Sequence, residues 1–404
     1  MLKMNTEPTP KAGPRILFLV TEDWFFRTHR LPLARACRDA GAEVYVMTYL
    51  NKPADDLAKE GFRVIPWQVT RGGTNPIAEA KVLTQVIRQY RRIRPDLVHH
   101  VALKPVVYGG LAARLFDIPT VNAVTGLGEA FTSSSTKLRA LRRLLKTLLA
   151  IAMNRKASRT IFQTNEDLEA LVSAGIVVRE SSYLIRGSGV DTDQYAPSPE
   201  PAGTPIVILP TRMIWSKGVG VFVEAARLLK ERGSNARFVL VGNPDLQNPN
   251  GVSEQQLKHW SESGIVEWWP HRTDMPSVFA QCTIVVFPSY YGEGVPKVLL
   301  EASSCGRPVI TTDSPGCRDA VRDAQNGFLV PRKDSAALAE AILHLLENPE
   351  LRVAMGTQGR QIAIKEFSVQ KVIVETELVY QDVLNSEWPS MTSRLTQISQ
   401  AAGD

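Results

Sequence analysis

The segment from residue 287 to residue 310, FPSYYGEGVPKVLLEASSCGRPVI, carries a pattern that points to chemistry. A strand is predicted to end at Phe287, a glycine-containing loop follows, and Pro296 is well placed as the first residue of a helix, whose N-terminus suits a phosphate. Glu293 lies in the loop and Glu301 in the helix. A carboxylate accepts two hydrogen bonds, so either could hold the vicinal diol of a ribose or a hexose. The same spacing also fits a solvated loop glutamate and a helical glutamate in a salt bridge.

A second loop supplies cations. The predicted strand that ends at Pro210 runs into TRMIWSKGVG, which places Arg212 and Lys217 in one loop before a helix. Arginine binds phosphate in a planar, bidentate way and lysine is a compact charge, so the pair could neutralise a diphosphate leaving group without a metal. Unpaired surface cations are the alternative, and the position at the carboxyl end of a strand favours a ligand site.

Histidines occur near the ends of two predicted strands. His29 and Arg30 lie in the loop or first helical turn after the first strand, which directs them toward a cleft and makes them candidates for binding a ligand there. His99 and His100 end another strand, where adjacent side chains point to opposite faces, so at most one of them can face a cleft. A structural role is expected for both.

Little in the sequence indicates a metal site. Asp191 and Asp193 have the spacing of a carboxylate pair, but they follow a glycine-containing segment without a neighbouring carboxylate or histidine, so we interpret them as a turn. The four cysteines show neither C-x-x-C spacing nor a histidine cluster, which indicates neither a zinc site nor a disulfide framework. We expect no metal and no cofactor.

Strand, turn and helix alternate along both halves of the chain, which predicts an α/β fold with parallel sheets. Ser188 to Pro205, with four prolines and two glycines, is the predicted linker. We expect two doubly wound domains that face each other across a cleft, with ligands beyond the carboxyl ends of the strands. The predicted division is a flexible N-terminus (1–14), an N-terminal domain (15–187), the linker (188–205), a C-terminal domain (206–385) and a tail (386–404).

Length and composition exclude several classes of protein. The 404 residues, 44% hydrophobic and 22% charged, fit two folded domains and exclude disordered, collagen-like and disulfide-scaffold proteins. The first apolar run, Ile16 to Val20, is too short for the core of a signal peptide, and no stretch approaches the roughly 20 apolar residues of a membrane span. A reducing cytosol is the expected compartment.

The net charge of +6 conceals an asymmetry between the two halves. Residues 1–186 carry 28 Lys and Arg and 16 Asp and Glu, net +12, whereas residues 187–404 carry 19 and 25, net −6. Residues 137–159 hold eight basic residues, no acidic one, and leucines at helical spacing. This amphipathic helix could lie on an anionic membrane or simply pack its leucines into the core. The candidate membrane-facing residues are Lys137, Arg139, Arg142, Arg143 and Lys146. Nucleic-acid binding is disfavoured, because aromatic residues are not interleaved with the basic ones.

Taken together, these motifs resemble a known family. Residues 15 to about 385 are similar to the retaining glycosyltransferases of family 4, which have the GT-B architecture of two Rossmann-like domains. The resemblance rests on Arg212 with Lys217-Gly218, Glu293-Gly-Val-Pro with Glu301-Ala, Cys305-Gly-Arg-Pro-Val-Ile, Thr312-Asp-Ser-Pro-Gly-Cys-Arg-Asp and Asn326-Gly-Phe-Leu-Val-Pro. The amino-terminal motifs resemble the subgroup that extends polyprenyl-diphosphate-linked sugars: Thr28-His-Arg-Leu-Pro-Leu-Ala, Lys104-Pro-Val-Val-Tyr-Gly and Gly126-Leu-Gly.

The resemblance implies that the N-terminal domain (15–187) binds the acceptor and that the C-terminal domain (206–385) binds the nucleotide sugar. It also implies roles for individual residues. Glu301 would hold the ribose of the nucleotide and Glu293 the hydroxyls of the donor sugar. The backbone N–H groups of Gly294 and Val295 would bind the phosphates. Arg212 and Lys217 would bind the diphosphate; with Glu293 they form the predicted catalytic set, and Lys104 and Gly126 join His29 and Arg30 as acceptor-side candidates.

Two positions depart from the family pattern. Many members have a histidine where this chain has Val101, so a sugar-contacting histidine cannot be transferred there. Pro270 stands where a glycine commonly precedes the loop that binds the base, which leaves a base-binding role for residues 271–274 open.

The sequence therefore predicts a cytoplasmic, membrane-peripheral, metal-independent, retaining glycosyltransferase. It would move a sugar, expected to be an N-acetylhexosamine from its UDP form, onto a lipid-diphosphate-linked saccharide. The alternatives are a glycosyltransferase that uses GDP-mannose or UDP-glucose for another acceptor, a nucleotide-sugar 2-epimerase of the same fold, and a binding protein without turnover. An NAD-dependent oxidoreductase is disfavoured, because no G-x-G-x-x-G follows the first strand.

Overall fold

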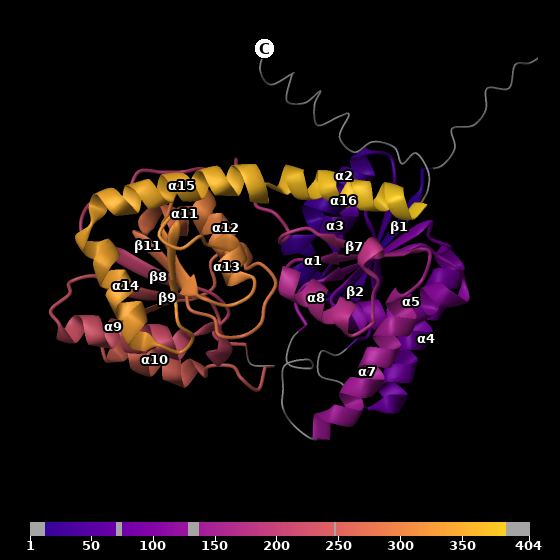
Figure 1. Ribbon diagram of the computed structural model, residues 1–404, viewed down its shortest axis with the longest axis horizontal. Coiled ribbons are helices and arrows are strands. Elements are labelled where there is room, and N and C mark those ends of the chain that lie inside the picture. The colour runs from indigo at the N-terminus through magenta and orange to yellow at the C-terminus, as the bar shows by residue number, and fades with distance from the viewer. Residues whose placement is uncertain (1–12, 70–74, 128–136, 246–247, 385–404) are drawn as a thin grey trace, which may run out of the picture.

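The structure, a computed structural model, describes residues 13–69, 75–127, 137–245 and 248–384, with only the backbone of 137–142. It contains two parallel sheets, one in each half of the chain (Figure 1). The first has the order β3-β2-β1-β4-β5-β6-β7, with β1 Arg15–Glu22, β2 Glu43–Tyr49, β3 Arg63–Pro66, β4 Leu97–Val101, β5 Thr120–Val124, β6 Ser158–Phe162 and β7 Ser182–Leu184. The second has the order β10-β9-β8-β11-β12-β13, with β8 Ile206–Pro210, β9 Arg237–Val241, β10 Glu267–Trp269, β11 Ile284–Phe287, β12 Val309–Thr312 and β13 Gly327–Val330.

Helices connect the strands and cover both faces of each sheet. In the first half they are α1 Asp23–His29, α2 Leu31–Asp39, α3 Asp55–Lys59, α4 Pro76–Ile93, α5 Leu103–Leu115, α7 Lys137–Met153 and α8 Asn165–Ser173. In the second half they are α9 Val219–Glu231, α10 Glu254–Glu262, α11 Met275–Gln281, α12 Lys297–Ser304, α13 Cys317–Ala320, α14 Ser335–Glu347, α15 Pro349–Phe367 and α16 Val369–Leu384.

Strand β1 shows why both faces of the first sheet must be covered. Its side chains alternate between two cores: Phe18 packs with residues of α2 and α16, whereas Leu17 packs with residues of α4 and α5. Strands buried on both faces read as continuous apolar runs, which is how β1 and β8 read in the sequence. This arrangement confirms the predicted pair of doubly wound α/β domains.

The topology fixes where a ligand can bind. In each sheet the strand order reverses next to a central strand, between β1 and β4 in the first and between β8 and β11 in the second. Loops after the strands at such a point diverge and leave a crevice. Helix α1 follows β1 directly, and residues 211–218 and 288–296 follow β8 and β11, so these segments form the facing walls of a cleft.

The last described helix returns to the first domain. Helix α15 ends at Phe367, Ser368 pairs with Val190 of the linker in an isolated bridge, and α16 then runs over the first domain (Figure 1). Val372 and Tyr380 of α16 belong to the core of that domain. The predicted C-terminal domain, 206–385, therefore includes a helix whose apolar side chains fill the first domain. The predicted tail, 386–404, lies outside the described residues.

Local differences from the prediction have structural reasons. Helix α1 begins at Asp23, immediately after β1, where a loop or first turn near His29 was predicted; Asp23 accepts hydrogen bonds from the backbone and side chain of Asn51, and Phe26 packs against Phe18. Strands β7 and β13, three and four residues long at the edges of the two sheets, were not predicted, whereas the equally short edge strands β3 and β10 were.

The basic segment forms helix α7 over Lys137–Met153, which is shorter than the predicted 137–159 because β6 begins at Ser158. Its inner side packs against α5: Leu149, Ala152 and Met153 are buried, and a Cβ atom added at Gly110 of α5 would lie 2.5 Å from the Cβ of Ala152. The interpretation in which leucines face the core therefore holds for this part of α7. The outer side is exposed at Arg143 and Leu144.

Candidate active site

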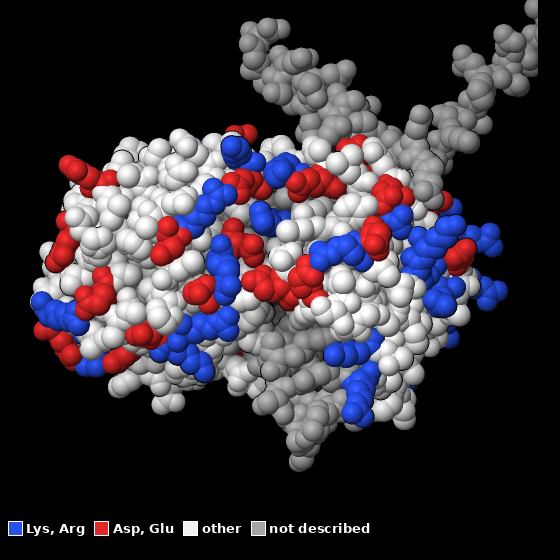
Figure 2. Space-filling view, in the orientation of Figure 1, with Lys and Arg blue, Asp and Glu red and all other residues white. Residues whose placement is uncertain are grey.

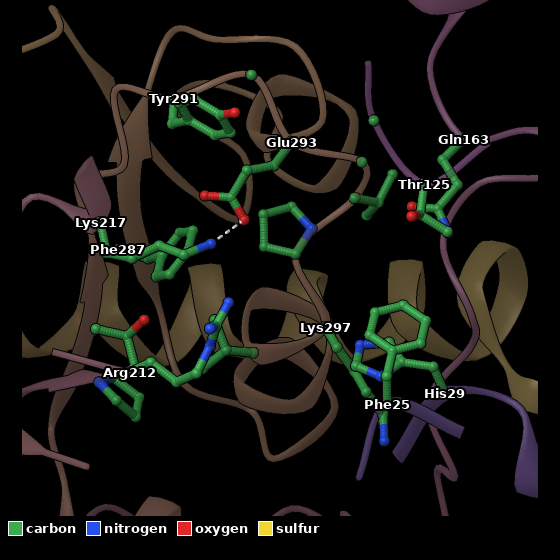
Figure 3. A pocket seen from close by; sticks show the side chains of 18 of the residues that line it. Phe25, His29, Thr125, Gln163, Arg212, Lys217, Phe287, Tyr291, Glu293 and Lys297 are labelled. Atoms are coloured by element: carbon green, nitrogen blue, oxygen red, sulfur yellow. Dashed lines mark hydrogen bonds and ion pairs between the residues drawn. The ribbon is translucent and has the colours of Figure 1, made fainter. Parts of the chain in front are cut away.

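A pocket of about 390 Å³ lies between the two domains, at the ends of the strands that the topology selects. Such a volume is within the range of small-molecule sites. The first domain contributes Trp24, Phe25, His29, Thr125, Gly126 and Gln163. The second contributes Pro210, Thr211, Arg212, Lys217, Phe287, the segment from Tyr291 to Pro296, Lys297 and Val298. Figure 3 shows Glu293 and Lys217 pointing toward each other, with Phe25, His29 and Lys297 together elsewhere in the pocket.

Lys217 and Glu293 form a fixed ion pair on the second-domain wall. The Lys217 Nζ lies 2.5 Å from Glu293 Oε2, and the Ser289 hydroxyl donates to Glu293 Oε1 over 2.5 Å. Gly218 explains how the two loops approach: its φ is +82°, and a Cβ there would lie 2.2 Å from the carbonyl oxygen of Pro288. The structure thus brings together two of the three residues of the predicted catalytic set in direct contact.

Arg212, the third residue, lines the same pocket. Its Nη1 lies 2.6 Å from Asp245 Oδ2, and its guanidinium lies over the ring of Trp24, 5.3 Å from the centroid. Because Trp24 follows β1, this contact crosses from one domain to the other. Arg212, Lys217 and Glu293 together form a polar wall, whose two cations could bind a diphosphate.

Gly294 lies at a direct contact between the two domains. Its N–H, predicted to bind a phosphate, donates to the Thr125 carbonyl over 3.3 Å, and Val295 beside it is buried. A Cβ at Gly294 would fall 1.9 Å from Gln163 Oε1, and a Cβ at Gly126 would fall 3.1 Å from the Gly294 nitrogen. The absence of side chains at both glycines therefore allows the two backbones to meet.

Helix α12 begins at Lys297, one residue later than predicted, with Pro296 in extended conformation before it. Glu301 lies one turn inside the helix, is 9% exposed and is not among the residues that line the pocket. Burial raises its pKa, although the Lys297 ammonium, 3.3 Å from Oε1, and the Tyr195 hydroxyl oppose the rise. The role of Glu301 toward a ribose stays a prediction.

Lys297 is a pocket residue that the sequence analysis missed. Besides its contact with Glu301, its Nζ donates to the Thr28 carbonyl of the first domain over 2.8 Å. The available signal was its position at the start of a helix, four residues before Glu301. Trp24, Phe25, Thr125, Gln163 and Tyr291 were also missed, and of these Trp24 and Phe25 had a signal, because they follow the first predicted strand.

The four acceptor-side candidates do not lie together. His29 lines the pocket and stacks on Phe25 with 4.1 Å between ring centroids. Burial, with the nearby charge of Lys297, lowers the pKa of His29 to about 3, so the ring is neutral near pH 7. Gly126 also lines the pocket. Arg30 is 5% exposed, lies outside the pocket and donates to the His29 carbonyl over 3.2 Å.

Lys104 lies elsewhere, on α5. Its Nζ lies 3.0 Å from Glu79 Oε1 of α4, and it does not line the pocket. The prediction that Lys104 joins the acceptor-side residues at the cleft is therefore not supported by its position. The cause is local: Lys104 stands in the first turn of α5, where its side chain reaches α4 instead of the second domain.

His99, His100 and the pair Asp191 and Asp193 make contacts within the fold. His99 Nδ1 lies 2.6 Å from the Tyr380 hydroxyl, and His100 Nδ1 lies 2.7 Å from Asn122 Oδ1; both rings are buried. Asp191 Oδ1 accepts the backbone N–H of Asp193, which is the predicted turn. In the described ranges, no group of three or more His, Cys, Asp and Glu side chains is arranged to hold a metal ion.

The outer surface of the first domain carries basic side chains. Figure 2 shows Lys and Arg gathered over α7 and over the side of the first domain remote from the cleft. Of the predicted membrane-facing residues, Arg143 is exposed and Lys146 half-buried, whereas the side chains of Lys137, Arg139 and Arg142 lie outside the described residues. Within the described part of the chain, none of the helices is both long and apolar enough to cross a bilayer.

Comparison with known families covers both domains. Residues 15–165 match the family described as glycosyl transferase 4-like, and residues 191–362 match the glycosyl transferases group 1. The chain belongs to the family 4 glycosyltransferases of GT-B fold. The two matches divide this glycosyltransferase where the structure divides it, with the pocket between them.

Two curated relatives span most of this glycosyltransferase. The N,N'-diacetylbacillosaminyl-diphospho-undecaprenol alpha-1,3-N-acetylgalactosaminyltransferase of Campylobacter jejuni is 29% identical over 83% of this chain and 90% of the relative. The UDP-Gal:alpha-D-GlcNAc-diphosphoundecaprenol alpha-1,3-galactosyltransferase of Escherichia coli is 26% identical over 76% and 81%, respectively. Both names contain a diphospho-undecaprenol acceptor.

Solved structures agree on the fold. Anabaena Alr3699/HepE, crystallised in complex with UDP and glucose, superposes with a TM-score of 0.74 at 22% identity, over 91% of this chain and 99% of that one. Sucrose-phosphate synthase of Thermosynechococcus elongatus gives a TM-score of 0.76 at 21% identity, over 93% and 100%.

Proposed function

We propose that this glycosyltransferase moves a hexose or N-acetylhexosamine from a UDP-sugar to a polyprenyl-diphosphate-linked saccharide, with retention of configuration and without a metal. The observation that carries the proposal is the set of cations in the cleft. Arg212, Lys217 and Lys297 line one pocket beside the N-terminus of α12. A nucleoside diphosphate is the leaving group that such a site would stabilise.

The choice of substrates rests on the relatives. Both curated relatives described above act on undecaprenol-diphosphate-linked sugars according to their names, and one name contains UDP-Gal as donor. Matches over more than three quarters of this chain include both walls of the cleft. We therefore assign the second-domain wall to the donor and the first-domain wall, with His29 and Gly126, to the acceptor.

The proposed reaction uses the leaving group as the base. The bond between the anomeric carbon and the diphosphate oxygen breaks, and the acceptor oxygen bonds to the same face of the sugar. Its proton passes to the departing phosphate oxygen. Arg212 and Lys217 stabilise the negative charge that develops on the diphosphate. Glu293, engaged by Lys217 and Ser289, is held for hydrogen bonds to the sugar hydroxyls instead of attack on the anomeric carbon.

We further propose that the outer side of α7 lies on an anionic membrane on the cytoplasmic face. The exposed Arg143 and Leu144 combine a cation with an apolar side chain, as interfacial helices do. A lipid-linked acceptor is held at such a surface, so docking there would bring the cleft near its substrate.

The direct test is turnover by the purified chain. UDP-sugars and GDP-mannose are offered one at a time with a synthetic polyprenyl-diphosphate-linked N-acetylhexosamine and EDTA, and the product is analysed by mass spectrometry and NMR. The proposal expects an α-linked disaccharide from one UDP-sugar. Transfer only from GDP-mannose would overturn the proposed donor, and loss of transfer in EDTA would overturn metal independence. A β-linked product would overturn retention. Conversion of the UDP-sugar to its epimer without transfer would overturn the proposed reaction.

A binding measurement supports the assay. Thermal unfolding is followed with excess UDP, GDP or NAD and EDTA present. A ligand at 100 times its Kd stabilises by about 2.7 kcal/mol, so binding is visible. UDP alone should stabilise the protein, and Arg212→Ala should reduce the effect. Stabilisation by GDP but not by UDP would contradict the proposed donor.

A further inference from the structure

Lys297 connects the two walls of the cleft. It is the first residue of α12, it lines the pocket, and its side chain is 25% exposed. Its ammonium lies 2.8 Å from the Thr28 carbonyl, in the first domain, and 3.3 Å from Glu301 Oε1, in its own helix. The same ammonium therefore contacts both the backbone near the end of α1, in the first domain, and a buried carboxylate of the second domain.

Glu301 is a buried carboxylate with few groups to stabilise its charge. The charged and titratable groups that act on it are Lys297 from its own helix, the Tyr195 hydroxyl from the linker, and the neutral thiol of Cys305 one turn further on. Among these, only Lys297 carries a positive charge. A buried carboxylate without a cation or sufficient hydrogen bonds is protonated instead of ionised.

The ribose-binding role that the family resemblance implies for Glu301 requires its side chain in the ionised form. A carboxylate accepts hydrogen bonds with both oxygens, so it can hold both hydroxyls of a ribose, whereas a carboxylic acid has lost part of that acceptor capacity. We propose that Lys297 is a positioning residue for the donor: its ammonium keeps Glu301 ionised and oriented for the ribose, and its bond to Thr28 links that carboxylate to the first domain. This inference rests on the proposed function, because it assumes that Glu301 binds the nucleotide.

The titration of Glu301 provides a readout. Burial raises the pKa of Glu301 and Lys297 lowers it, so loss of Lys297 moves the pKa further upward. Donor affinity, which needs the carboxylate, then falls at a higher pH than in the wild type as the solution is acidified. An opposite charge within about 4 to 6 Å shifts a carboxyl pKa by about 1 to 3. The midpoint should therefore rise by about one pH unit or more.

The experiment measures the Kd of UDP-N-acetylglucosamine by calorimetry from pH 5 to pH 8.5. Its diphosphate is esterified at both ends and so lacks the phosphate ionisation with a pKa of about 6 that would confuse a titration with UDP. Lys297→Met should shift the midpoint upward, and Lys297→Arg should keep it near the wild-type value. Arg212→Met, which removes a cation from the cleft but not from Glu301, should weaken binding without moving the midpoint.

Glu301→Gln separates the inference from the proposed function. If the proposed site is right, this variant binds weakly, and the step assigned to Glu301 disappears from its pH profile; any remaining step belongs to other groups. Wild-type affinity in Glu301→Gln, or no binding by the wild-type protein, would overturn the donor site and the inference together. A functional Glu301 with an unmoved midpoint in a folded Lys297→Met would overturn the inference alone.

Discussion

The two walls of the cleft are built in different ways. On the second domain, the residues predicted to bind the diphosphate come from two short loops after adjacent strands, and Lys217 meets Glu293 directly. On the first domain, the predicted acceptor-side residues separate: His29 and Gly126 reach the pocket, Arg30 is buried behind it, and Lys104 is on α5. The residues proposed to bind the diphosphate are thus concentrated in short segments, whereas the proposed acceptor wall depends on how helices pack.

The largest effect is expected at the ion pair of the second wall. Lys217→Ala removes a cation proposed to stabilise the diphosphate and leaves Glu293 without its ammonium partner. Loss of one such group lowers kcat by about 10²- to 10³-fold. Steady-state transfer assays with the UDP-sugar measure the change in kcat. Arg237→Ala is the control, because Arg237, the first residue of β9, pairs with Glu267 of β10 and neither lines the pocket. Turnover near the wild-type value in Lys217→Ala would contradict the proposed role of this wall.

The basic outer surface of the first domain gives the next largest effect. Replacement of Arg142, Arg143 and Lys146 by glutamine removes three cations, each contributing about 1 kcal/mol at an anionic membrane. Binding to phosphatidylglycerol-containing liposomes should then fall about 100-fold in a flotation assay, with unchanged affinity for UDP.

A matched control makes the same change of charge on the other domain. Arg227 and Lys230 lie on α9 and Arg232 directly follows it. Replacement of these three residues by glutamine should leave liposome binding nearly as it is in the wild type. Equal losses in the two triple variants would mean that net charge, and not the surface of α7, determines membrane binding.

Two glycines of the first domain separate backbone strain from contact across the cleft. Gly126 and Gly175 have φ values of +119° and +66°. Alanine costs about 1 to 2 kcal/mol of stability in the left-handed conformation of Gly175, and at least as much at Gly126, whose φ is further from that conformation. Only at Gly126 does the added Cβ meet the other wall, 3.1 Å from the Gly294 nitrogen; at Gly175 nothing lies within 4 Å. We expect about tenfold lower kcat/KM in Gly126→Ala and unchanged kcat/KM in Gly175→Ala. Equal kcat/KM values would show that this close approach is unimportant for turnover.

The fold and the second wall were largely predictable for one reason. Short apolar runs bounded by turn residues, such as Ile206–Pro210, indicate buried strands, and the residues after them then lie at the carboxyl edge of the sheet. Arg212, Lys217 and Glu293 follow their strands closely, so position along the chain fixed their place in space. Helix α16 could not be placed this way, because nothing local to it specifies which domain it covers.

The first wall was harder because its geometry depends on tertiary contacts. Arg30 is adjacent to His29, yet one side chain reaches the pocket and the other is buried, since α1 ends and α2 begins between them. Lys297 was missed for a similar reason: its bond to Thr28 joins residues 269 positions apart. Spacing predicts contacts within one turn or loop, but not between domains.

The smallest effect concerns a carboxylate beside the first wall. Asp167, on α8, has its pKa raised to about 6, chiefly by burial and further by the charges of Glu166 and Asp319. Because the folded pKa exceeds the unfolded value, the folded state binds more protons between the two, and the ionised carboxylate destabilises the fold at higher pH. Asp167→Asn should therefore stabilise the protein at pH 7.5, by about 1 kcal/mol after allowance for partial exposure.

The pH dependence distinguishes this explanation from a general effect of the substitution. As the pH falls below about 6, Asp167 becomes protonated in the folded state, so most of the advantage of the asparagine should be lost by pH 4.5. Urea unfolding of both proteins at the two pH values measures it. Glu169→Gln on the same helix, whose exposed carboxylate pairs with Arg179, should show no such gain. An equal gain at both pH values would mean that the charge of Asp167 is not the cause, and that this wall tolerates an ionised carboxylate as well as the second wall tolerates Glu293.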